Sequence, residues 1–302
     1  MTKWALIKKN RGLYLLLLPA VVLVLLFAYL PMYGVVIAFK DYRGFLGITG
    51  SPWADPLFRH FTRFFSSFQF GNIIRNTLFI SFYNLIVMVP LPIFLALIIN
   101  QMRLKTYKRI FQTITYLPYF ISTVVVVGML LIILSPGAGL IGNFYRLFGS
   151  QAPNLMGSAN LFSSIYVWSG VWQNTGWDSI IYLAALSAVD PGLYEAAVID
   201  GANRWQKIWK IDFPMLLPTA CILLILRAGH IMNIGFEKIY LMQNSLNITT
   251  SEVISTYVYR IGILGAQYSF SAAINLFNTV INLILLLSVN YFSRKFSETS
   301  LW

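Results

Sequence analysis

Polar side chains that could contact a hydrophilic solute lie inside or next to three long apolar segments. Asp178 lies in the apolar segment 161–186, and Arg227 lies in the apolar segment 215–236. A charged group inside a membrane is costly, so it usually faces a cavity or pairs with an opposite charge. The residues that we expect to line a hydrophilic pathway are Trp172, Asn174, Trp177, Asp178, Arg227, Asn233, Glu237, Asn275, Asn278 and Asn282.

The spacing of these residues predicts polar faces on two helices. At about 100° per residue, four side chains fall within roughly a third of one helical surface: Arg227, His230, Asn233 and Glu237. The asparagines between 275 and 282 form a narrow stripe on another helix.

Two interpretations of the polar stripes remain open. In the first, the asparagines and the Asp178–Arg227 pair only satisfy each other between helices. In the second, amides bind sugar hydroxyls while Trp172 and Trp177 stack on the apolar faces of sugar rings. We expect any single asparagine to be a helix–helix contact. We expect the stripes together to line a cavity, because contacts alone need fewer polar groups.

The composition indicates a polytopic membrane protein. Hydrophobic residues make up 58% of the 302 residues and charged residues only 11%, against about 25% charged in soluble domains. We attribute the net charge of +12 to cytoplasmic loops and lipid headgroups, and expect no nucleic-acid binding. Cys221 is the single cysteine, and His60 and His230 are the two histidines. These are too few for a metal site, so we expect no metal and read His230 as a structural or cavity residue.

The expected fold is all-α with six transmembrane helices. Each needs about 20 apolar residues to cross the bilayer, and the predicted spans are 13–30, 76–100, 111–134, 161–186, 215–236 and 272–292. In the third span, polar side chains recur at helical spacing: Gln112, Thr115, Tyr116, Tyr119, Ser122 and Thr123. We expect a tail, first span and external loop in 1–75, and a transport core in 76–302.

Clusters of basic residues predict the orientation of the chain, because cytoplasmic loops are rich in Lys and Arg. The basic residues in the tail, in two loops and after the last span are Lys3, Lys8, Lys9, Arg11, Arg103, Lys105, Lys108, Arg109, Arg204, Lys207, Lys210, Arg294 and Lys295. Both termini are therefore predicted to be cytoplasmic.

The segment 190–218 differs from its surroundings because it carries acids, bases and turn residues. Asp190 can cap a helix, and Pro191 suits the first helical position, where its missing N–H has no cost. The pattern predicts a short helix over 193–199.

A turn and a second helix follow in the same segment. Asp200 and Gly201 predict the break, and a second helix is expected over 202–211. Pro214 and Pro218 either end this helix or open the next span. The result is a helix–turn–helix at the membrane surface; the alternative is an amphipathic pair that only lies on lipid headgroups.

This segment resembles a known motif. The tripeptide 195–197, Glu-Ala-Ala, is followed after three residues by Gly201, and after nine more by 211–214, Ile-Asp-Phe-Pro. The pattern is similar to the EAA motif of binding-protein-dependent ABC importer permeases. That family usually has Leu where this chain has Phe213.

The resemblance extends over nearly the whole chain. Four further stretches are similar to the polysaccharide-type branch of carbohydrate permeases: MYGVVIAFKDY at 32–42, SPW at 51–53, TYLPYFIS at 115–122 and SLW at 300–302.

The resemblance implies the permease subunit of a type I ABC importer in the bacterial cytoplasmic (inner) membrane, in contact with lipid. Its implied partners are a second permease subunit, two ATPase subunits that bind ATP and Mg, and an extracytoplasmic solute-binding protein. It also implies that ATP-driven closure moves the helix pair and switches the cavity between the two sides. The residues implied to couple the ATPase to transport are Glu195, Ala196, Ala197, Asp200, Gly201 and Pro214.

Motifs for chemistry are absent from the sequence. No G-x-x-x-x-G-K-[ST], G-x-S-x-G or H-E-x-x-H pattern occurs, so we expect neither an ATPase site in this chain nor an enzyme. The alternative is an ion-coupled secondary sugar transporter, which would share the polar stripes without needing the helix pair, and which would be expected to carry inverted repeats. A membrane scaffold without a pathway is a third possibility, and the polar stripes argue against it.

The expected substrate is an acidic oligosaccharide. The branch that the chain resembles includes importers of oligosaccharides from alginate and pectin. The similarity to the first permease subunit of a bacterial alginate importer makes alginate the specific candidate. Five arginines on the predicted outer side agree with an acidic substrate and could equally contact lipid or the binding protein: Arg43, Arg59, Arg63, Arg75 and Arg146.

Overall fold

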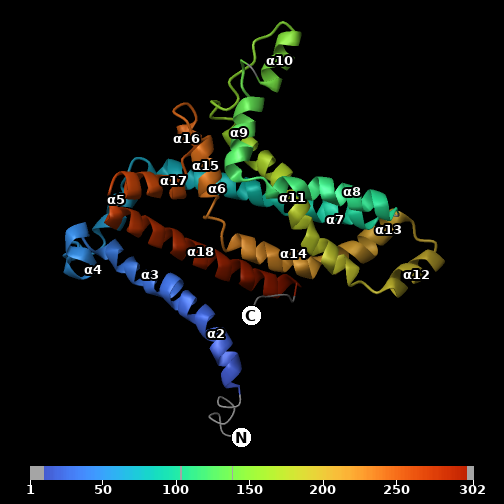
Figure 1. Cartoon of the computed structure of the whole chain (residues 1–302), viewed down its shortest axis with the longest axis horizontal. Coiled ribbons are helices and arrows are strands. Elements are labelled where there is room, and N and C mark those ends of the chain that lie inside the picture. The colour runs from blue at the N-terminus through green and yellow to red at the C-terminus, as the bar shows by residue number, and fades with distance from the viewer. Residues whose placement is uncertain (1–9, 103, 138, 298–302) are drawn as a thin grey trace. The chain divides into compact units, whose positions relative to one another are not determined.

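The structure is a computed structural model that describes residues 10–102, 104–137 and 139–297 (Figure 1). Three groups of residues used above lie outside these ranges: the tail lysines Lys3, Lys8 and Lys9, Arg103, and the closing run 300–302. Within the described ranges the regular structure is helical, and one isolated β-bridge joins Lys40 and Trp53. The predicted all-α fold is confirmed.

The chain divides into two compact units. One comprises the residues up to Ser67 together with Val258–Phe277, and the other comprises Phe68–Tyr257 together with the residues after Phe277. The predicted division between residues 1–75 and a transport core in 76–302 is a functional one, which these two structural units do not test, and it stays a prediction.

The first unit begins with an apolar helix of 29 residues, Arg11–Phe39. It is built from α2 (Arg11–Val24), a π-helical turn (Leu25–Tyr29), α3 (Leu30–Met32) and a 3₁₀-helix (Tyr33–Phe39). The helix is long and apolar enough to be the predicted N-terminal span, and it is longer than the predicted 13–30. The unit also contains a 3₁₀-helix (Gly44–Leu46), α4 (Gly47–Gly50), α5 (Arg59–Phe65), a π-helix (Tyr259–Leu264) and the start of α18 (Tyr268–Ser297).

The second unit holds the other helices. They are α6 (Phe70–Met88), α7 (Pro90–Asn100), α8 (Lys105–Tyr116), α9 (Thr123–Ile133), α10 (Leu140–Leu147), α11 (Phe162–Ser187), α12 (Pro191–Ile199), α13 (Arg204–Lys207), α14 (Phe213–Ala228), α15 (Phe236–Met242) and α16 (Ile248–Ser251). Helix α17 (Ile254–Val258) lies at the boundary with the first unit.

Helix α11 is central to the second unit, where it packs along α7 and also contacts α6, α8 and α14 (Figure 1). Gly176 allows the close approach to α8, because a Cβ at this position would lie 1.9 Å from the Thr115 carbonyl oxygen. Buried Tyr182 and Leu186 of α11 pack with Ile99 of α7 and Leu216 of α14. This core fixes α11 and α14, which carry five of the ten predicted pathway residues.

The prediction of one straight helix over 111–134 is wrong. Helix α8 continues into a 3₁₀ turn (Leu117–Phe120), and α9 then leaves at 97°. Pro118 lies in the turn, and the Ser122 hydroxyl accepts a hydrogen bond from the Val125 N–H (3.4 Å), which makes it the N-cap of α9. The residues from Gln112 to Thr123 therefore do not form one continuous polar face.

The predicted helix over 215–236 is wrong at its end. Helix α14 stops at Ala228 and α15 starts at Phe236, so Arg227, Asn233 and Glu237 do not share one helical face. The break lies between Gly229 and Gly235, where side chains of other helices hold the backbone, as described below.

The predicted end of the second surface helix near 211 is also wrong. The backbone forms a π-helical turn at Ile208–Asp212, directly before Pro214, and the helix runs on without interruption over Arg204–Ala228. Pro214 lies in the first turn of α14 and Pro218 lies inside it. The surface helix and the predicted span that follows it therefore form one continuous, rod-like helix, Arg204–Ala228.

The described residues contain four helices long and apolar enough to cross a membrane, or five if the bent α8–α9 pair is one span. The four are Arg11–Phe39, Phe70–Asn100, Arg204–Ala228 and Tyr268–Lys295. The predicted six spans are not confirmed. The 26-residue α11 is long enough but is not among the four, and it carries Gln173, Asn174 and Asp178.

Candidate functional site

The helix–turn–helix predicted in 190–218 is present. Helix α12 begins after Asp190, whose carboxylate accepts a hydrogen bond from a backbone N–H of the first turn (2.9 Å). Gly201 forms the turn with a φ of +73°, which glycine adopts at little cost. A capping box between Asn203 and Gln206 then starts α13. The predicted break at Gly201 is confirmed.

Most of the residues implied to couple the ATPase lie on the surface of this motif. Glu195, Ala196, Asp200, Gly201 and Pro214 are exposed, and Ala197 is half-buried. Next to them, Val198 and Ile199 expose 60% and 85% of their surface. A short helix that presents large aliphatic side chains beside Glu195 offers a surface on which a partner can dock.

Asp212 anchors this motif to the helix bundle. It is completely buried and accepts hydrogen bonds from Gln101 Nε2 (2.7 Å), from Asn100 Nδ2 (3.4 Å) and from the Tyr194 hydroxyl. Burial and the bond to Asp212 raise the pKa of Tyr194 to about 12, so its hydroxyl remains a donor at neutral pH. Sequence reasoning missed this contact; the Asp within the 211–214 run was the available signal.

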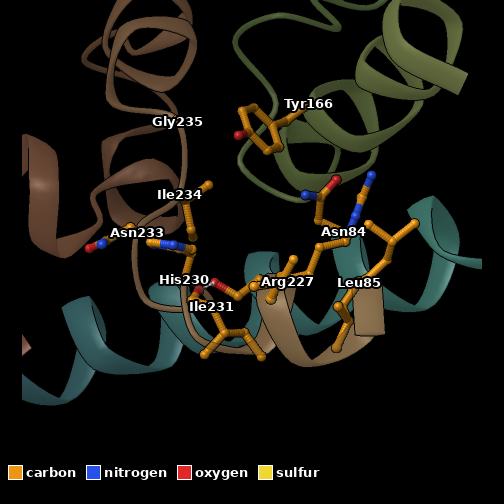
Figure 2. Close-up of a pocket in the computed structure, with 12 residues that line it drawn as sticks. Asn84, Leu85, Tyr166, Arg227, His230, Ile231, Asn233, Ile234 and Gly235 are labelled. Carbon is orange, nitrogen blue, oxygen red and sulfur yellow. Dashed lines mark hydrogen bonds between the residues drawn. The ribbon is translucent and has the colours of Figure 1, made fainter. Parts of the chain in front are cut away.

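A cavity of about 360 Å³ lies beside the break between α14 and α15. Figure 2 shows Asn84 and Tyr166 facing His230 and Asn233 across this cavity, with Arg227 between them. The cavity therefore gathers amide, aromatic and basic side chains from α6, α11 and α14 and from the non-helical segment.

A second cavity, of about 470 Å³, shares Asn84, Tyr166 and Gly235 with the first. It is also lined by Gln173 and Asn174, by the bend between α8 and α9, and by Lys238 of α15. Of the predicted pathway residues, Asn174 belongs to this cavity. Lys238, which lies just beyond the apolar segment 215–236, was not among the predicted residues.

Arg227 and Asp178 form an ion pair, with Arg227 Nη2 donating to Asp178 Oδ2 at 2.5 Å. Both line a third cavity of about 450 Å³ together with Trp177. The Trp177 ring stacks on Tyr119, with centroids 4.4 Å apart and planes at 3°. The predicted pairing is present, and it joins α11 to α14.

The asparagines of α18 hold the break between α14 and α15. Asn282 Oδ1 accepts from the Met232 N–H (3.0 Å), and Asn278 Nδ2 donates to Asn233 Oδ1 (2.7 Å). Ser81 of α6 donates to the Ile231 carbonyl oxygen. Among the described residues, Asn278 Oδ1 and Asn282 Nδ2 are buried without a hydrogen-bond partner.

Five predicted pathway residues do not line the three cavities just described: the buried Asn278 and Asn282, and three exposed residues. The three exposed residues are Trp172, Glu237 and Asn275.

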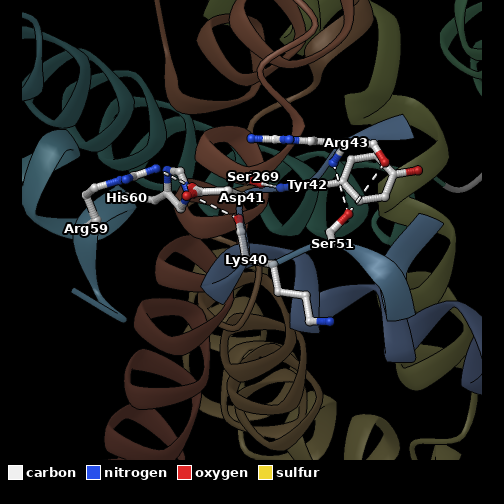
Figure 3. A network of polar contacts seen from close by, with 8 residues as sticks. All are labelled: Lys40, Asp41, Tyr42, Arg43, Ser51, Arg59, His60 and Ser269. Carbon is white, nitrogen blue, oxygen red and sulfur yellow. Dashed lines mark hydrogen bonds and ion pairs between the residues drawn. The ribbon is translucent and has the colours of Figure 1, made fainter. Parts of the chain in front are cut away.

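The first unit carries a separate polar network (Figure 3). Asp41 pairs with Arg59 and lies 3.2 Å from His60 Nε2, which also lies 3.1 Å from the Lys40 carbonyl oxygen. A shallow hollow beside Asp41 is lined by three of the five predicted outer arginines: Arg43, Arg59 and Arg63. Arg75 lines a different cavity, in the second unit, and Arg146 binds Asn143 of its own helix, α10. The structure thus brings three of the five arginines together.

Residues 88–298 match the family of binding-protein-dependent transport system inner membrane components. The match covers more than half of the chain, and the chain therefore belongs to this family. It is the transmembrane permease component of a binding-protein-dependent importer.

Individual relatives agree over nearly the full length. Protein LplB of Bacillus subtilis (strain 168) is 40% identical over 298 residues, which cover 99% of this chain and 93% of LplB. The polygalacturonan/rhamnogalacturonan transport system permease protein YteP of the same organism is 40% identical over 294 residues, covering 97% and 91%.

Solved structures show the same similarity. A chain in the crystal structure of a bacterial alginate ABC transporter, in complex with alginate pentasaccharide-bound periplasmic protein, is 41% identical to this chain. The two superpose with a TM-score of 0.90, and 99% of each chain is covered. A second structure, of a bacterial ABC transporter involved in import of the acidic polysaccharide alginate, gives 41% identity and the same score over 97% of this chain and 99% of that chain.

Proposed function

We propose that this permease translocates acidic oligosaccharides, with alginate- or pectin-derived chains as the first candidates. The support comes from the relatives, one named for polygalacturonan and rhamnogalacturonan and two from alginate transporters. Arg43, Arg59 and Arg63 around one hollow supply positive charge that would attract such substrates.

The proposed transport mechanism rests on one observation: the hydrogen bond from Tyr194 to Asp212 anchors α12 to the helix bundle. A partner that pushes on α12 also pushes on the rod Arg204–Ala228, because Tyr194 is bonded to Asp212 within that rod. We propose that α12 docks on an ATPase subunit at the cytoplasmic surface, with Glu195 and Ile199 in the contact. ATP and Mg would be bound by two such partner subunits.

The cavities beside Arg227, Asn233 and Asn174 are proposed as parts of the pathway. Movement of the rod Arg204–Ala228 displaces Arg227, which borders two of these cavities, and so opens them to one side of the membrane at a time. A second permease subunit would complete the pathway, and an extracytoplasmic binding protein would deliver the substrate.

The test is ATP-driven uptake of labelled uronic-acid oligosaccharides by proteoliposomes containing the chain with its co-encoded permease, ATPase and binding protein. Val198→Asp should abolish both uptake and the ATPase stimulation by the loaded binding protein, because it places a charge in the docking surface. Leu147→Asp is the matched control, at an equally aliphatic position that is 83% exposed and follows Arg146 on the predicted outer side. Uptake that follows an ion gradient without ATP would instead support a secondary transporter.

A further inference from the structure

Lys238 lies in the first turn of α15, against the side of α11. Its Nζ donates to the Tyr166 carbonyl oxygen at 3.1 Å and lies 5.1 Å from the centroid of the Tyr166 ring. Gly170 lies on the next turn of α11, where even a Cβ would come within 3.6 Å of Nζ. The ammonium group is therefore held at a defined place on the wall of the 470 Å³ cavity.

This ammonium group has no counter-ion within the described residues. No carboxylate lies within 4.0 Å of Lys238 Nζ among them, whereas Arg227 has Asp178 and Arg59 has Asp41. Burial alone lowers the pKa of Lys238 to about 8. A partly buried cation without a counter-ion is destabilising, so folding alone gives little reason to keep a lysine here.

The rest of the cavity fits a sugar. Asn84, Gln173 and Asn174 supply amides, and Ser122 and Thr123 line the same wall. Gln173 Nε2 donates a hydrogen bond to the Ile121 carbonyl oxygen (2.9 Å), and Asn174 Nδ2 donates one to the Gly170 carbonyl oxygen (2.9 Å). Their amide oxygens are the groups left to accept bonds from sugar hydroxyls.

The aromatic rings and the size of the cavity agree with this chemistry. Tyr119 and Phe120 also line it, and they offer rings to the apolar face of a pyranose. The volume lies within the range of about 300–1,000 Å³ that is usual for small-molecule sites.

We propose that Lys238 binds the carboxylate of one uronic-acid unit as it passes through this cavity, and that this contact makes the permease prefer acidic over neutral oligosaccharides. The inference rests on the proposed oligosaccharide transport and adds the residue that selects for charge. A charge-assisted hydrogen bond is among the stronger contacts that a side chain can make, so one lysine can decide the preference.

The experiment compares two matched substrates in proteoliposomes with the complete transporter: a uronic-acid oligosaccharide and the same oligosaccharide with its carboxyl groups reduced to alcohols. Lys238→Met should raise the KM for the acidic substrate about 10- to 100-fold and leave the KM for the neutral one unchanged. Lys238→Arg should keep the preference. Lys295→Met, at an exposed lysine of α18, is the control and should change neither value.

A structural role for Lys238 gives a different result. Equal losses for both substrates, or no change for either, would overturn the proposal while transport by the wild-type chain stands. If Lys238→Met does not assemble, Lys238→Gln decides the matter, because its amide can still donate to Tyr166. Failure of the wild-type transporter to import either substrate with ATP would reject the proposed function itself, and this inference with it.

Discussion

The Tyr194 hydroxyl on α12 donates a hydrogen bond to Asp212, the last residue of the π-helical turn before α14. Asn100 and Gln101, at the end of α7, donate to the same carboxylate. Because a buried carboxylate is strongly destabilised when a donor is lost, this one side chain holds three segments together. A force on α12 is therefore transmitted to the bundle at Asp212.

Removing the hydroxyl in Tyr194→Phe should weaken this connection. We expect a loss of about 1–3 kcal/mol in stability and a marked decrease in ATPase stimulation by the loaded binding protein. The hydroxyl titrates only near pH 12, so its contribution is fully present below the unfolded pKa of about 10 and disappears only as the pH rises through 12. The effect should therefore be equal at pH 6.5 and pH 9.

Thermal unfolding of the assembled complex and ATPase assays at both pH values check this prediction. Tyr145→Phe, on α10, is the matched control and should behave as wild type. A Tyr194→Phe variant with normal stability and normal stimulation would show that Asp212 does not need this donor.

The contact of α11 with α8 predicts an unusually sensitive glycine. In Gly176→Ala the new Cβ would fall 1.9 Å from the Thr115 carbonyl oxygen, so the helices must separate. We expect little assembled transporter, measured as the yield of monodisperse complex after extraction in mild detergent. Gly128→Ala in α9, where a Cβ meets nothing within 4 Å, should give a normal yield.

The Arg227–Asp178 pair can be tested by a double-mutant cycle. Arg227→Met and Asp178→Asn should each destabilise by about 1–3 kcal/mol, because each leaves a partly buried charge alone. The double variant should be more stable than the sum of the single losses predicts, as measured by thermal unfolding. Strictly additive losses would mean that the two side chains do not interact.

Gly201 should tolerate only residues that accept a positive φ. Gly201→Val should cost at least about 1–2 kcal/mol at a φ of +73°, and it should reduce ATPase stimulation because α12 would leave its position. Gly201→Asn, a residue that adopts this conformation more easily, should retain most of the activity. Equal activity of both variants in the reconstituted complex would show that the turn geometry is not needed.

Transport of acidic substrates should depend on pH through Lys238. Its folded pKa of about 8 lies below the ordinary 10.5, so protonation disfavours the folded state below pH 8, and stability rises as the pH increases from 8 to 10.5. The neutral amine cannot bind a carboxylate as an ion pair, so uptake of acidic oligosaccharide should fall above pH 8.

The control for this prediction is Lys238→Arg, which stays charged and should show no such fall. The titratable groups near Lys238 are Tyr166 of α11, Tyr119 across the cavity and Glu237 of its own helix. Uptake of the carboxyl-reduced substrate should be flat over the same range. A parallel fall for both substrates would place the pH dependence elsewhere.

Local signals in the sequence predicted the surface motif well. The cap at Asp190 and the turn at Gly201 depend on neighbouring residues alone, and both are present. The break after Ala228 could not be predicted in the same way, because Ile231, Met232 and Ile234 continue the apolar pattern. Contacts from distant Ser81 and Asn282 hold the backbone there.

The prediction of pathway residues was limited in the same way, because contacts between distant segments decide where these side chains lie. Asp178 and Arg227 were predicted to meet because opposite charges in apolar segments need each other, and they do. Lys238 was missed because its contact with Tyr166, 72 residues earlier in the chain, is not encoded by any local pattern. Asn278 and Asn282 bond to Asn233 and to the Met232 backbone and line none of the cavities described above, so their roles in transport stay predictions.

The polarity of α11 has a consequence for how the chain enters the membrane during synthesis. Asp178 reaches its partner Arg227 only after 49 further residues have been made, and α11 is not among the helices apolar enough to cross alone. We therefore expect the insertion of α11 to depend on α14, which carries Arg227. Truncation after α12 should leave α11 poorly inserted, whereas truncation after α14 should not.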